Sequence, residues 1–283
     1  MPFASLIICT RNRAEKLNSM LGKYPKLGVN ASRFEMVIVD NGSSDNTANV
    51  IDDFRENIDC AVKTVSCVDV GLGNARNAGV TASSGEWLIF TDDDCFLADT
   101  FFSTFLQKAD VSRFQYGSGQ ILLPEKDDDP RIASRLLAKE LILPPPQILT
   151  TGVIQGANMF FHRSVFDRVG LFNKLMGAGT PFACEDIEMA CRASIGGYRG
   201  ALIPDLIAFH HHGRKIGSQE ALDTIHAYDF GRGAYYASIF LRFGAKEIFD
   251  IWKQGTMNND RSDIEKLSRE LEGAFNYLRV ASA

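Results

Sequence analysis

The sequence lacks the features that mark several large classes of protein. Its 283 residues contain no run approaching the roughly 18–20 apolar residues of a membrane-spanning helix. The first residues, MPFASLIICTRNR, have no basic segment before their short apolar run, so no signal peptide is predicted. Lys and Arg (30) do not outnumber Asp and Glu (35), and this mild acidity excludes nucleic acid as an expected partner.

Cysteine pairs are also missing. The six cysteines are scattered without a CxxC spacing, which indicates reduced thiols of a cytoplasmic protein rather than a disulfide framework. Hydrophobic residues make up 45% of the chain and charged residues 23%, so we expect a folded core rather than disorder. The length allows one large domain or two small ones.

Two hydrophobic periodicities alternate over the first hundred residues. Short apolar runs predict strands at residues 5–9, 34–39, 61–68 and 87–90. Helical patterns lie between them, at residues 14–21, 47–54 and 74–83. Strand–helix alternation with near-continuous apolar strands predicts an α/β fold, with a parallel sheet covered on both faces.

The pattern changes after residue 90. We expect a solvated acidic turn at Asp127-Asp128-Asp129, an extended segment at 151–161, a helix at 181–193 and a strand at 206–209. Beyond residue 212 the chain becomes helical and aromatic. Its last helix is predicted to carry Ile264, Leu267, Leu271 and Phe275 on one apolar face.

The aromatic segment 228–249 allows two interpretations. Arg232, Arg242 and Lys246 accompany its aromatic residues, which suits a helix lying on a membrane surface. The favoured interpretation is that this aromatic face packs on the rest of the chain or on a second subunit.

Polar clusters follow three of the predicted strands, at Thr10-Arg11-Asn12, Asp40-Asn41-Gly42-Ser43 and Thr91-Asp92-Asp93-Asp94. Ligands of open parallel sheets bind at the carboxyl ends of the strands, so these clusters predict a site. The second cluster alone would be an ordinary turn. The three consecutive carboxylates of the third repel one another unless a cation neutralises them, and oxygen ligands select Mg²⁺ or Mn²⁺.

Further along the chain are three polar motifs. Gly71-Leu72-Gly73 opens a predicted helix that carries Arg76, which suits a phosphate or a nucleobase edge, although a surface arginine is the default. Glu185-Asp186 begins another helix, either to complement its dipole or to supply a general base. His210-His211-His212 lacks zinc-finger spacing, and a single imidazole joining the Asp92/Asp94 site fits better.

In this order the motifs resemble the inverting glycosyltransferases of family 2, which have the GT-A fold. The resemblance covers residues 5–213, through SLIICTRNR, VIVDNGSSDNT, GLGNARNAG with ASSGEWLIFTDDDC, GANMFFHRSVFDRVGLFN and CEDIEMACR…GGYRGALIPDLIAFHHHG. It implies a nucleotide-sugar donor, a divalent metal and direct displacement at the anomeric carbon with inversion.

Roles on the donor side follow from this resemblance. The nucleotide-sugar would be bound by Thr10, Arg11, Asn12, Asp40, Gly73, Arg76, Asp92 and Asp93. Asp92 and Asp94 match the DXD motif, with Asp94 as the direct metal ligand and Asp92 nearer the ribose. Asp93 stands where a small or neutral residue is frequent, which leaves the ligand set open.

Roles on the acceptor side follow in the same way. Asp186 matches the catalytic base, Glu185 beside it shapes the acceptor site, and Asn158 belongs to a segment that borders the acceptor pocket. His210 matches a histidine that completes the metal site in some members, with His211 and His212 as alternatives. We expect the glycine-containing segment 177–182 to be a mobile acceptor loop.

The resemblance also predicts the organisation of the chain. We expect a GT-A domain at 1–220, with a nucleotide-sugar-binding half (1–95) and an acceptor-binding half (96–220), followed by a helical appendage (221–283). The expected donor is a UDP-, dTDP- or GDP-sugar, and the expected acceptor a glycan or lipid-linked glycan of cell-surface polysaccharide synthesis. Such a protein would be cytoplasmic, and peripheral contact with the cytoplasmic face of the membrane is an alternative that the sequence allows.

Two other functions share some of these features. A sugar nucleotidyltransferase also uses carboxylates and a metal, but it usually has a glycine-rich loop after the first strand, where this chain has Thr10-Arg11-Asn12-Arg13. A non-catalytic nucleotide- or sugar-binding module would not need both Asp94 and Asp186.

Overall fold

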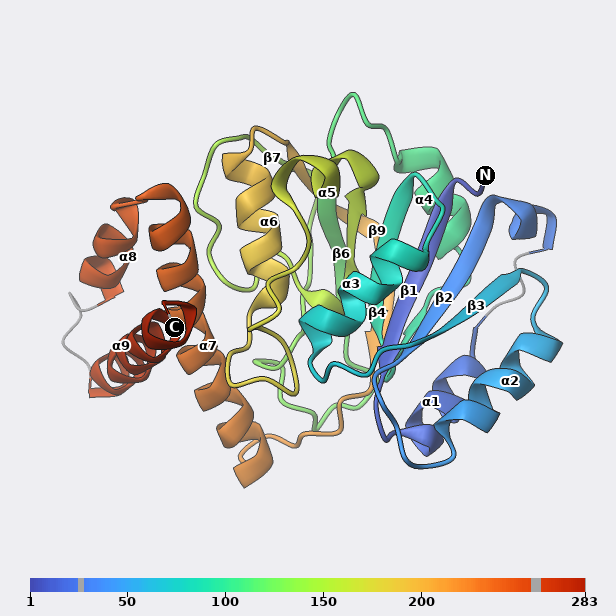
Figure 1. The fold of residues 1–283 in the computed structure, drawn as a ribbon, viewed down its shortest axis with the longest axis horizontal. Helices are drawn as coiled ribbons and strands as arrows, with labels where there is room; N and C mark the ends of the chain where they lie inside the picture. The colour runs from blue at the N-terminus through green and yellow to red at the C-terminus, as the bar shows by residue number, and fades with distance from the viewer. Residues whose placement is uncertain (25–27, 256–260, 283) are drawn as a thin grey trace.

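A single mixed sheet with helices on both faces organises the protein in the computed structural model, which describes residues 1–24, 28–255 and 261–282 (Figure 1). The strand order is β3-β2-β1-β4-β8-β6-β9-β5, with β7 paired to β9. The strands are β1 (Ala4–Thr10), β2 (Phe34–Asp40), β3 (Ala61–Ser66), β4 (Trp87–Asp92), β5 (Cys95–Leu97), β6 (Tyr116–Leu122), β7 (Leu141–Leu143), β8 (Met159–His162) and β9 (Gly200–His210).

The predicted parallel pairing holds in the first half of the sheet. There β1 pairs in parallel with both β2 and β4, and β2 with β3. Beyond β4 the sheet becomes mixed, because β8 runs antiparallel to β4 and β6 while β9 runs parallel to β6. The α/β fold class is therefore confirmed, with its parallel part concentrated in the first hundred residues.

Alternate residues of the strands feed two separate cores. Ile7 and Val37 join the core on one face, under α3 and α6, whereas Leu6 and Ile38 join the other, under α1, α2 and α4. The helices are α1 (Ala14–Leu21), α2 (Thr47–Asn57), α3 (Leu72–Ala82), α4 (Phe101–Lys108), α5 (Arg163–Val169), α6 (Glu185–Ile195), α7 (Gln219–Phe243), α8 (Glu247–Gly255) and α9 (Arg261–Ala281). Successive side chains of each strand point to opposite faces of the sheet, so each strand contributes to the packing of both helical layers.

The C-terminal helices α7, α8 and α9 form a bundle beside α6, at the end of the molecule far from β3 (Figure 1). The aromatic segment of α7 packs inward in large part, since Tyr235 and Tyr236 are buried in the core shared with α6. This burial agrees with the favoured packing interpretation. Among the described residues, no helix is long and apolar enough to cross a membrane.

The predicted apolar face of the last helix is only partly covered, since Leu267 and Leu271 are half-buried but the other two residues are not. Ile264 is 54% exposed and Phe275 68% exposed, whereas Ala274 and Tyr277 pack inward in their place. The cause is a close backbone approach of α7 and α9, because a Cβ on Gly233 would overlap the carbonyl oxygen of Glu270. Small residues at the crossing, rather than the larger apolar ones, decide which face is buried.

Substituting Gly233 by alanine tests this crossing. We expect Gly233→Ala to lower the free energy of unfolding by about 1–3 kcal/mol, because the added methyl forces the two backbones apart. Gly22→Ala is the matched control, since its Cβ would meet only ordinary contacts at a right-handed φ. Urea unfolding of both variants measures the difference, and equal midpoints would contradict the proposed close packing.

Candidate active site

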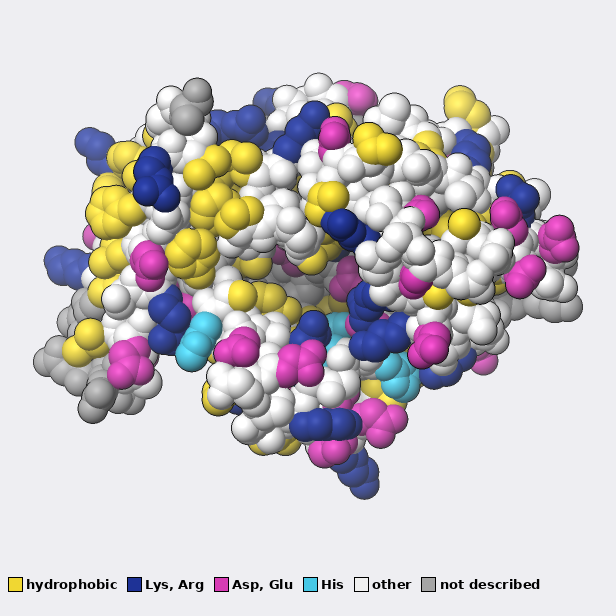
Figure 2. Space-filling view, turned by 60° about the horizontal axis from the view of Figure 1, so that its bottom comes forward, with side chains coloured by type: hydrophobic (Ala, Val, Ile, Leu, Met, Phe, Trp, Pro, Cys, Tyr) yellow, Lys and Arg dark blue, Asp and Glu magenta, His cyan; other side chains and the backbone are white. Residues whose placement is uncertain are grey.

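A cavity of about 770 Å³ opens at the carboxyl ends of β1 and β4. Figure 2 shows it as a hollow with acidic, basic and histidine side chains around it. Its walls come from the ends of these strands, the start of α3, the loop 177–184, the start of α6 and the first turns of α7. Parallel strands that end together therefore gather the motifs, as the sequence predicts.

Most of the predicted site residues line this cavity. They are Thr10, Arg11, Arg76, Asp92, Asp93, Asp94, Glu185, Asp186 and His210. The structure leaves Asn12, Asp40, Gly73 and Asn158 off its wall.

Two of these four tie loops together. The side-chain oxygen of Asn12 accepts a hydrogen bond from the backbone N–H of Ser44 (2.7 Å), which joins the loops after β1 and β2. Asp40 accepts one from the N–H of Ser43 (2.9 Å) within its own turn. The neighbouring Asn41 lines the cavity, and its side-chain amide is bonded to the backbone of the loop 67–71, so a nucleotide contact of Asp40 stays a prediction.

The other two serve packing. A Cβ on Gly73 would lie 2.7 Å from the carbonyl oxygen of Met176, so glycine there allows α3 to meet the loop 173–178. Asn158 is fully buried, and its amide donates to the carbonyls of Gln120 and Leu206 at 2.8 and 2.9 Å. It bridges β6 and β9 behind the cavity, so direct contact with an acceptor is not supported.

The middle carboxylate of the acidic triplet points into the protein. Asp93 is 3% exposed, accepts a hydrogen bond from Thr10 Oγ1 (2.7 Å) and pairs with Arg13. Burial raises the pKa of Asp93 to about 6, against the opposing effect of Arg13. Arg13 also donates to Asp94 Oδ2 at 2.6 Å. One arginine thus holds two neighbouring carboxylates in fixed directions, and sequence reasoning missed it because no local pattern marks it.

The other two carboxylates of the triplet belong to a group of four side chains that could hold a metal ion. One potential ligand atom from each of Asp92, Asp94, Cys95 and His210 lies within 4.8 Å of the others. His210 Nδ1 lies 3.2 Å from the carbonyl oxygen of Ala133, which leaves Nε2 facing Asp94 Oδ1 at 3.2 Å. Such an outer hydrogen bond fixes a metal-ligating imidazole, so the donor set fits a divalent cation. Of the three adjacent histidines, His210 is the one in this group.

Charge pairing shifts the proton affinities of this group. Burial opposes the shift, but hydrogen bonding to His210 and the charge of Arg13 hold the pKa of Asp94 below its ordinary value. Burial alone would lower the pKa of His210, and its contact with Asp94 raises it. A metal ion would take the place of the imidazole proton.

Arg76 connects the metal group to the acidic start of α6. Its guanidinium is 3% exposed, pairs with Glu185, and lies 3.4 Å from Asp92 Oδ1. Gly156 leaves the space for it, because a Cβ there would overlap Arg76 Nη2. Despite the charge of Arg76, burial raises the pKa of Glu185 to about 7.

Asp186 lies next to this ion pair. Its two oxygens accept backbone N–H bonds from Gly156 (2.8 Å) and Ile187 (2.7 Å). Burial raises the pKa of Asp186, although Arg76 and these N–H groups oppose the shift. Cys184, in the left-handed region at φ 77°, turns the chain into α6 and presents both carboxyl groups to the cavity.

Backbone hydrogen bonds hold the loop 177–182, which the sequence predicts to be mobile. Leu72 N–H donates to the carbonyl of Ala178 (2.9 Å), and Gly177 N–H donates to that of Phe182 (2.7 Å). A hinge motion of this loop would have to break these bonds, and its mobility stays a prediction.

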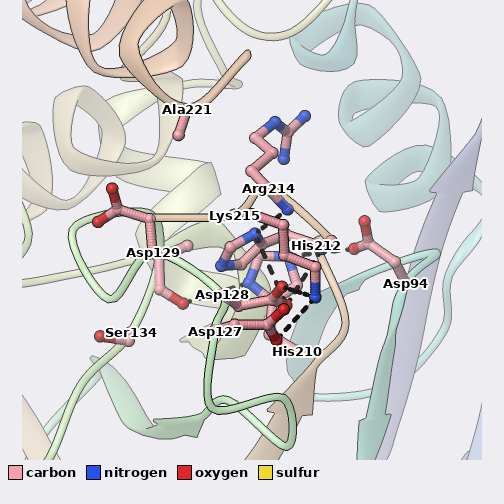
Figure 3. A network of polar contacts seen from close by, with 12 residues as sticks. Asp94, Asp127, Asp128, Asp129, Ser134, His210, His212, Arg214, Lys215 and Ala221 are labelled. Carbon is pink, nitrogen blue, oxygen red and sulfur yellow. Dashed lines mark hydrogen bonds and ion pairs between the residues drawn. The ribbon is translucent and has the colours of Figure 1, made fainter. Parts of the chain in front are cut away.

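The segment predicted as a solvated acidic turn is only partly solvated, because Asp127 is exposed and the two residues after it are buried. Asp128 and Asp129 are 2% and 1% exposed. Lys215 Nζ lies 2.9 Å from Asp128 Oδ1, and His212 Nδ1 lies 4.0 Å from its Oδ2 (Figure 3). The partners come from the segment after β9, nearly ninety residues away, so local sequence could not reveal them.

The first turns of α7 also reach the cavity, through Thr224, Ala227, Tyr228 and Arg232. Arg232 donates to Thr151 Oγ1 (2.8 Å) and Glu270 Oε1 (2.6 Å), which links the cavity wall to α9. The part of the chain predicted as an appendage therefore contributes to the site. A run of aromatic and helical residues gives no signal for this role.

The site thus lies at the edge of the sheet in an α/β fold, with acidic groups on both sides of a buried arginine. Comparison with known proteins identifies the family of the chain. Residues 5–170 match the family described as glycosyl transferase family 2, and the chain belongs to this family. It is a glycosyltransferase with the GT-A fold.

Individual relatives agree with this assignment. The chain is 26% identical to glycosyltransferase AglE of Haloferax volcanii over 74% of its own length and 67% of that protein. It is 32% identical to a PGL/p-HBAD biosynthesis glycosyltransferase of Mycobacterium tuberculosis, over 41% of this chain and 46% of that one. The alignment thus spans less than half of the mycobacterial protein.

Solved structures show the same fold. Mannosyltransferase PcManGT from Pyrobaculum calidifontis, in complex with GDP-Man and Mn²⁺, has a TM-score of 0.60 at 16% identity, covering 98% of this chain and 87% of that one. Residues 1–349 of Staphylococcus aureus TarS, in complex with UDP-GlcNAc, have a TM-score of 0.55 at 16% identity, covering 97% and 82%.

Removing Arg13 tests how the acidic triplet is held. The folded-state pKa of Asp93, about 6, lies above its ordinary value of 3.8, so ionisation of Asp93 costs stability as pH rises through this window. Arg13→Ala raises that pKa further and removes a partner of Asp94. We expect a loss of about 1.5–3 kcal/mol at pH 7.5 in metal-free buffer, and a smaller loss near pH 4, where Asp93 is protonated in the folded protein whether or not Arg13 is present.

The measurement is urea unfolding at both pH values in the presence of EDTA. Arg55→Ala is the control, because Arg55 forms an exposed pair with Asp52, and its effect stays within about 0.5 kcal/mol at either pH. A loss for Arg13→Ala that does not grow with pH would contradict the assigned role.

Proposed function

We propose that the protein is a metal-dependent inverting glycosyltransferase. In this proposal it moves a sugar from a nucleotide-diphosphate sugar to a hydroxyl of a glycan or lipid-linked acceptor in cell-surface polysaccharide synthesis. The observation that carries the proposal is Arg76, which lies between Asp92 of the metal group and Glu185 at the start of α6. The cavity therefore has two separate acidic sites, one for a leaving group and one for an acceptor.

Asp94, Asp92 and His210 are the proposed metal ligands, with Cys95 beside them. A bound Mn²⁺ or Mg²⁺ would supply positive charge to a departing diphosphate. Arg76, whose side chain is 3% exposed, adds a fixed cation beside this group. Thr10 and Arg13 hold Asp93 inward, which leaves Asp92 and Asp94 to face the ligand.

Asp186 is the proposed catalytic base. A hydroxyl is a poor nucleophile and needs a carboxylate within hydrogen-bond reach to accept its proton. The backbone N–H groups of Gly156 and Ile187 fix the Asp186 carboxyl, and Glu185 beside it is held by Arg76. A base on the opposite side of Arg76 from the metal group suits a single displacement with inversion.

The donor belongs to the UDP, dTDP or GDP class. Two proteins of the same fold support this range, since TarS is solved with UDP-GlcNAc and PcManGT with GDP-Man. On the acceptor side, exposed apolar residues of the C-terminal helices, Leu241, Phe243 and Phe249, support peripheral contact with the cytoplasmic face of a membrane, where a lipid-linked acceptor would lie.

Metal binding is the first test. We expect Mn²⁺, followed by electron paramagnetic resonance, to bind the wild-type protein and to tighten nucleoside-diphosphate binding relative to EDTA. Asp94→Asn weakens Mn²⁺ binding by about 10-fold or more, because it removes an anionic ligand whose pKa the site keeps low. Asp52→Asn, at an exposed carboxylate of α2, is the control. Equal Mn²⁺ affinities in the two variants would rule out the proposed ligands.

Catalysis is the second test. We expect Asp186→Asn to bind metal and nucleoside diphosphate as the wild type does, and to lower kcat by about 10²–10⁴-fold, since it removes the base. Retained transfer would place the base elsewhere. A non-catalytic module would bind nucleotide but transfer nothing even as wild type, and a nucleotidyltransferase would release diphosphate from a nucleoside triphosphate.

The pH profile distinguishes the roles of the two neighbouring carboxyl groups. The wild-type kcat/KM falls as pH decreases below about 7, because the coupled pair takes up a proton there. Glu185→Gln moves this fall to lower pH, since it removes a negative charge beside Asp186. An unchanged profile in Glu185→Gln would show that the two groups do not titrate together.

A further inference from the structure

Arg214 is a cation of the cavity wall without a strong partner. Its Nε is buried and makes no hydrogen bond, and the exposed Glu220 lies 3.5 Å away. The side chain of Glu220 is 71% exposed, so this ion pair is screened by water and contributes little. Figure 3 shows the guanidinium extending away from the carboxylates of the network below it. A buried, unsatisfied guanidinium donor is costly, which points to a missing anion.

The backbone around Arg214 is held in place by the segment 125–131. Asp129 N–H donates to the carbonyl of Arg214 (2.8 Å), and Ile216 N–H donates to that of Asp127 (2.9 Å). Arg214 N–H in turn donates to His212 Nδ1 at 2.9 Å. These bonds join two segments distant in sequence, so the direction of Arg214 is built into the fold.

Arg131 belongs to the same wall and is positioned by the same residue. The Asp129 carboxylate accepts hydrogen bonds from Arg131 Nε at 2.9 Å and from its Nη2 at 2.5 Å. Asp129 thus binds Arg131 through its side chain and Arg214 through its backbone. This pairing occupies one edge of the Arg131 guanidinium, and its side chain is 57% exposed.

Two of the three carboxylates of this region face inward, and all three are already paired with cations. Asp128 is buried against Lys215, which also contacts Asp127 at 2.9 Å. Asp129 is 1% exposed and bound to Arg131. The charge that remains available toward the cavity is therefore cationic, although the local sequence is rich in aspartate.

We propose that Arg214 and Arg131 form a phosphate-binding subsite of the cavity. Arginine guanidinium groups match phosphate oxygens through paired hydrogen bonds, and two arginines fixed by one aspartate are pre-organised for this. Both share the cavity with His210 and Tyr228. The inference deepens the proposed function and rests on it for the source of the phosphate, which is either a phosphate-bearing acceptor or the donor diphosphate.

The test uses the full chain, with glycerol 3-phosphate and a nucleoside diphosphate as probes. Isothermal titration calorimetry measures glycerol 3-phosphate binding to the protein alone and to protein saturated with Mn²⁺ and the nucleoside diphosphate. The variants are Arg131→Ala/Arg214→Ala and Arg214→Lys. Lys126→Ala is the control, because it removes an exposed cation from the same loop. Thermal unfolding checks that each variant folds.

Two results support the subsite and identify its source. If the phosphate belongs to the acceptor, glycerol 3-phosphate binds the saturated protein, and the double variant weakens this binding by about 10-fold or more. If it belongs to the donor, the nucleoside diphosphate competes with glycerol 3-phosphate, and the double variant weakens nucleotide binding by a similar factor. Arg214→Lys has an intermediate effect, since it keeps the charge and loses the paired geometry.

The subsite is overturned if the double variant binds both probes as the Lys126→Ala control does, or if wild type binds neither. Failure of the proposed function is distinguishable from this outcome. A protein that binds no nucleoside diphosphate with Mn²⁺ contradicts the proposed function, while glycerol 3-phosphate binding to the protein alone still decides the subsite.

Discussion

The buried charge of Arg76 is the constraint on which the site depends. A guanidinium that is 3% exposed must be paired, because an isolated buried charge costs several kcal/mol. Its partner Glu185 lies 109 residues further along the chain, so the pair joins the start of α3 to the start of α6. Gly156 leaves room for the guanidinium. The two acidic halves of the cavity are thereby held at a fixed distance across one arginine.

The same pairing explains the unusual proton affinities at the start of α6. Burial favours the neutral form of Glu185 and Asp186, while Arg76 favours the charged form, and the balance leaves the pKa of Glu185 at about 7. The proposed base, Asp186, shares this burial and this arginine, and a raised carboxyl pKa suits acceptance of a proton near neutral pH. Arg76 therefore both joins α3 to α6 through its ion pair and sets the charge state of the carboxyl groups at the start of α6.

The strands and the motifs at their ends could be predicted because their signals are local. An apolar run followed by polar residues marks β1, β2 and β4, and Asp92, Asp94 and Glu185 follow from motif and position. Arg13 could not be predicted, since its contact with Asp93 depends on how the loop after β1 turns back. Asp128 looks solvated in the sequence and is buried because Lys215 and the rest of its segment cover it. Partners from distant segments carry no local pattern.

In the proposed function, the net charge of the metal group would couple metal binding to nucleotide binding. In the protein alone, Arg13 pairs with Asp93 and Asp94, and His210 lies against Asp94. Arg76, whose main partner is Glu185, lies 3.4 Å from Asp92, so the acidic triplet is partly neutralised. In the proposed function, a divalent cation would displace the imidazole proton and add net positive charge to this largely buried group. The diphosphate of the proposed donor would supply the balancing negative charge. Metal and nucleotide are thus expected to bind more tightly together than either binds alone, because each removes the electrostatic cost of the other.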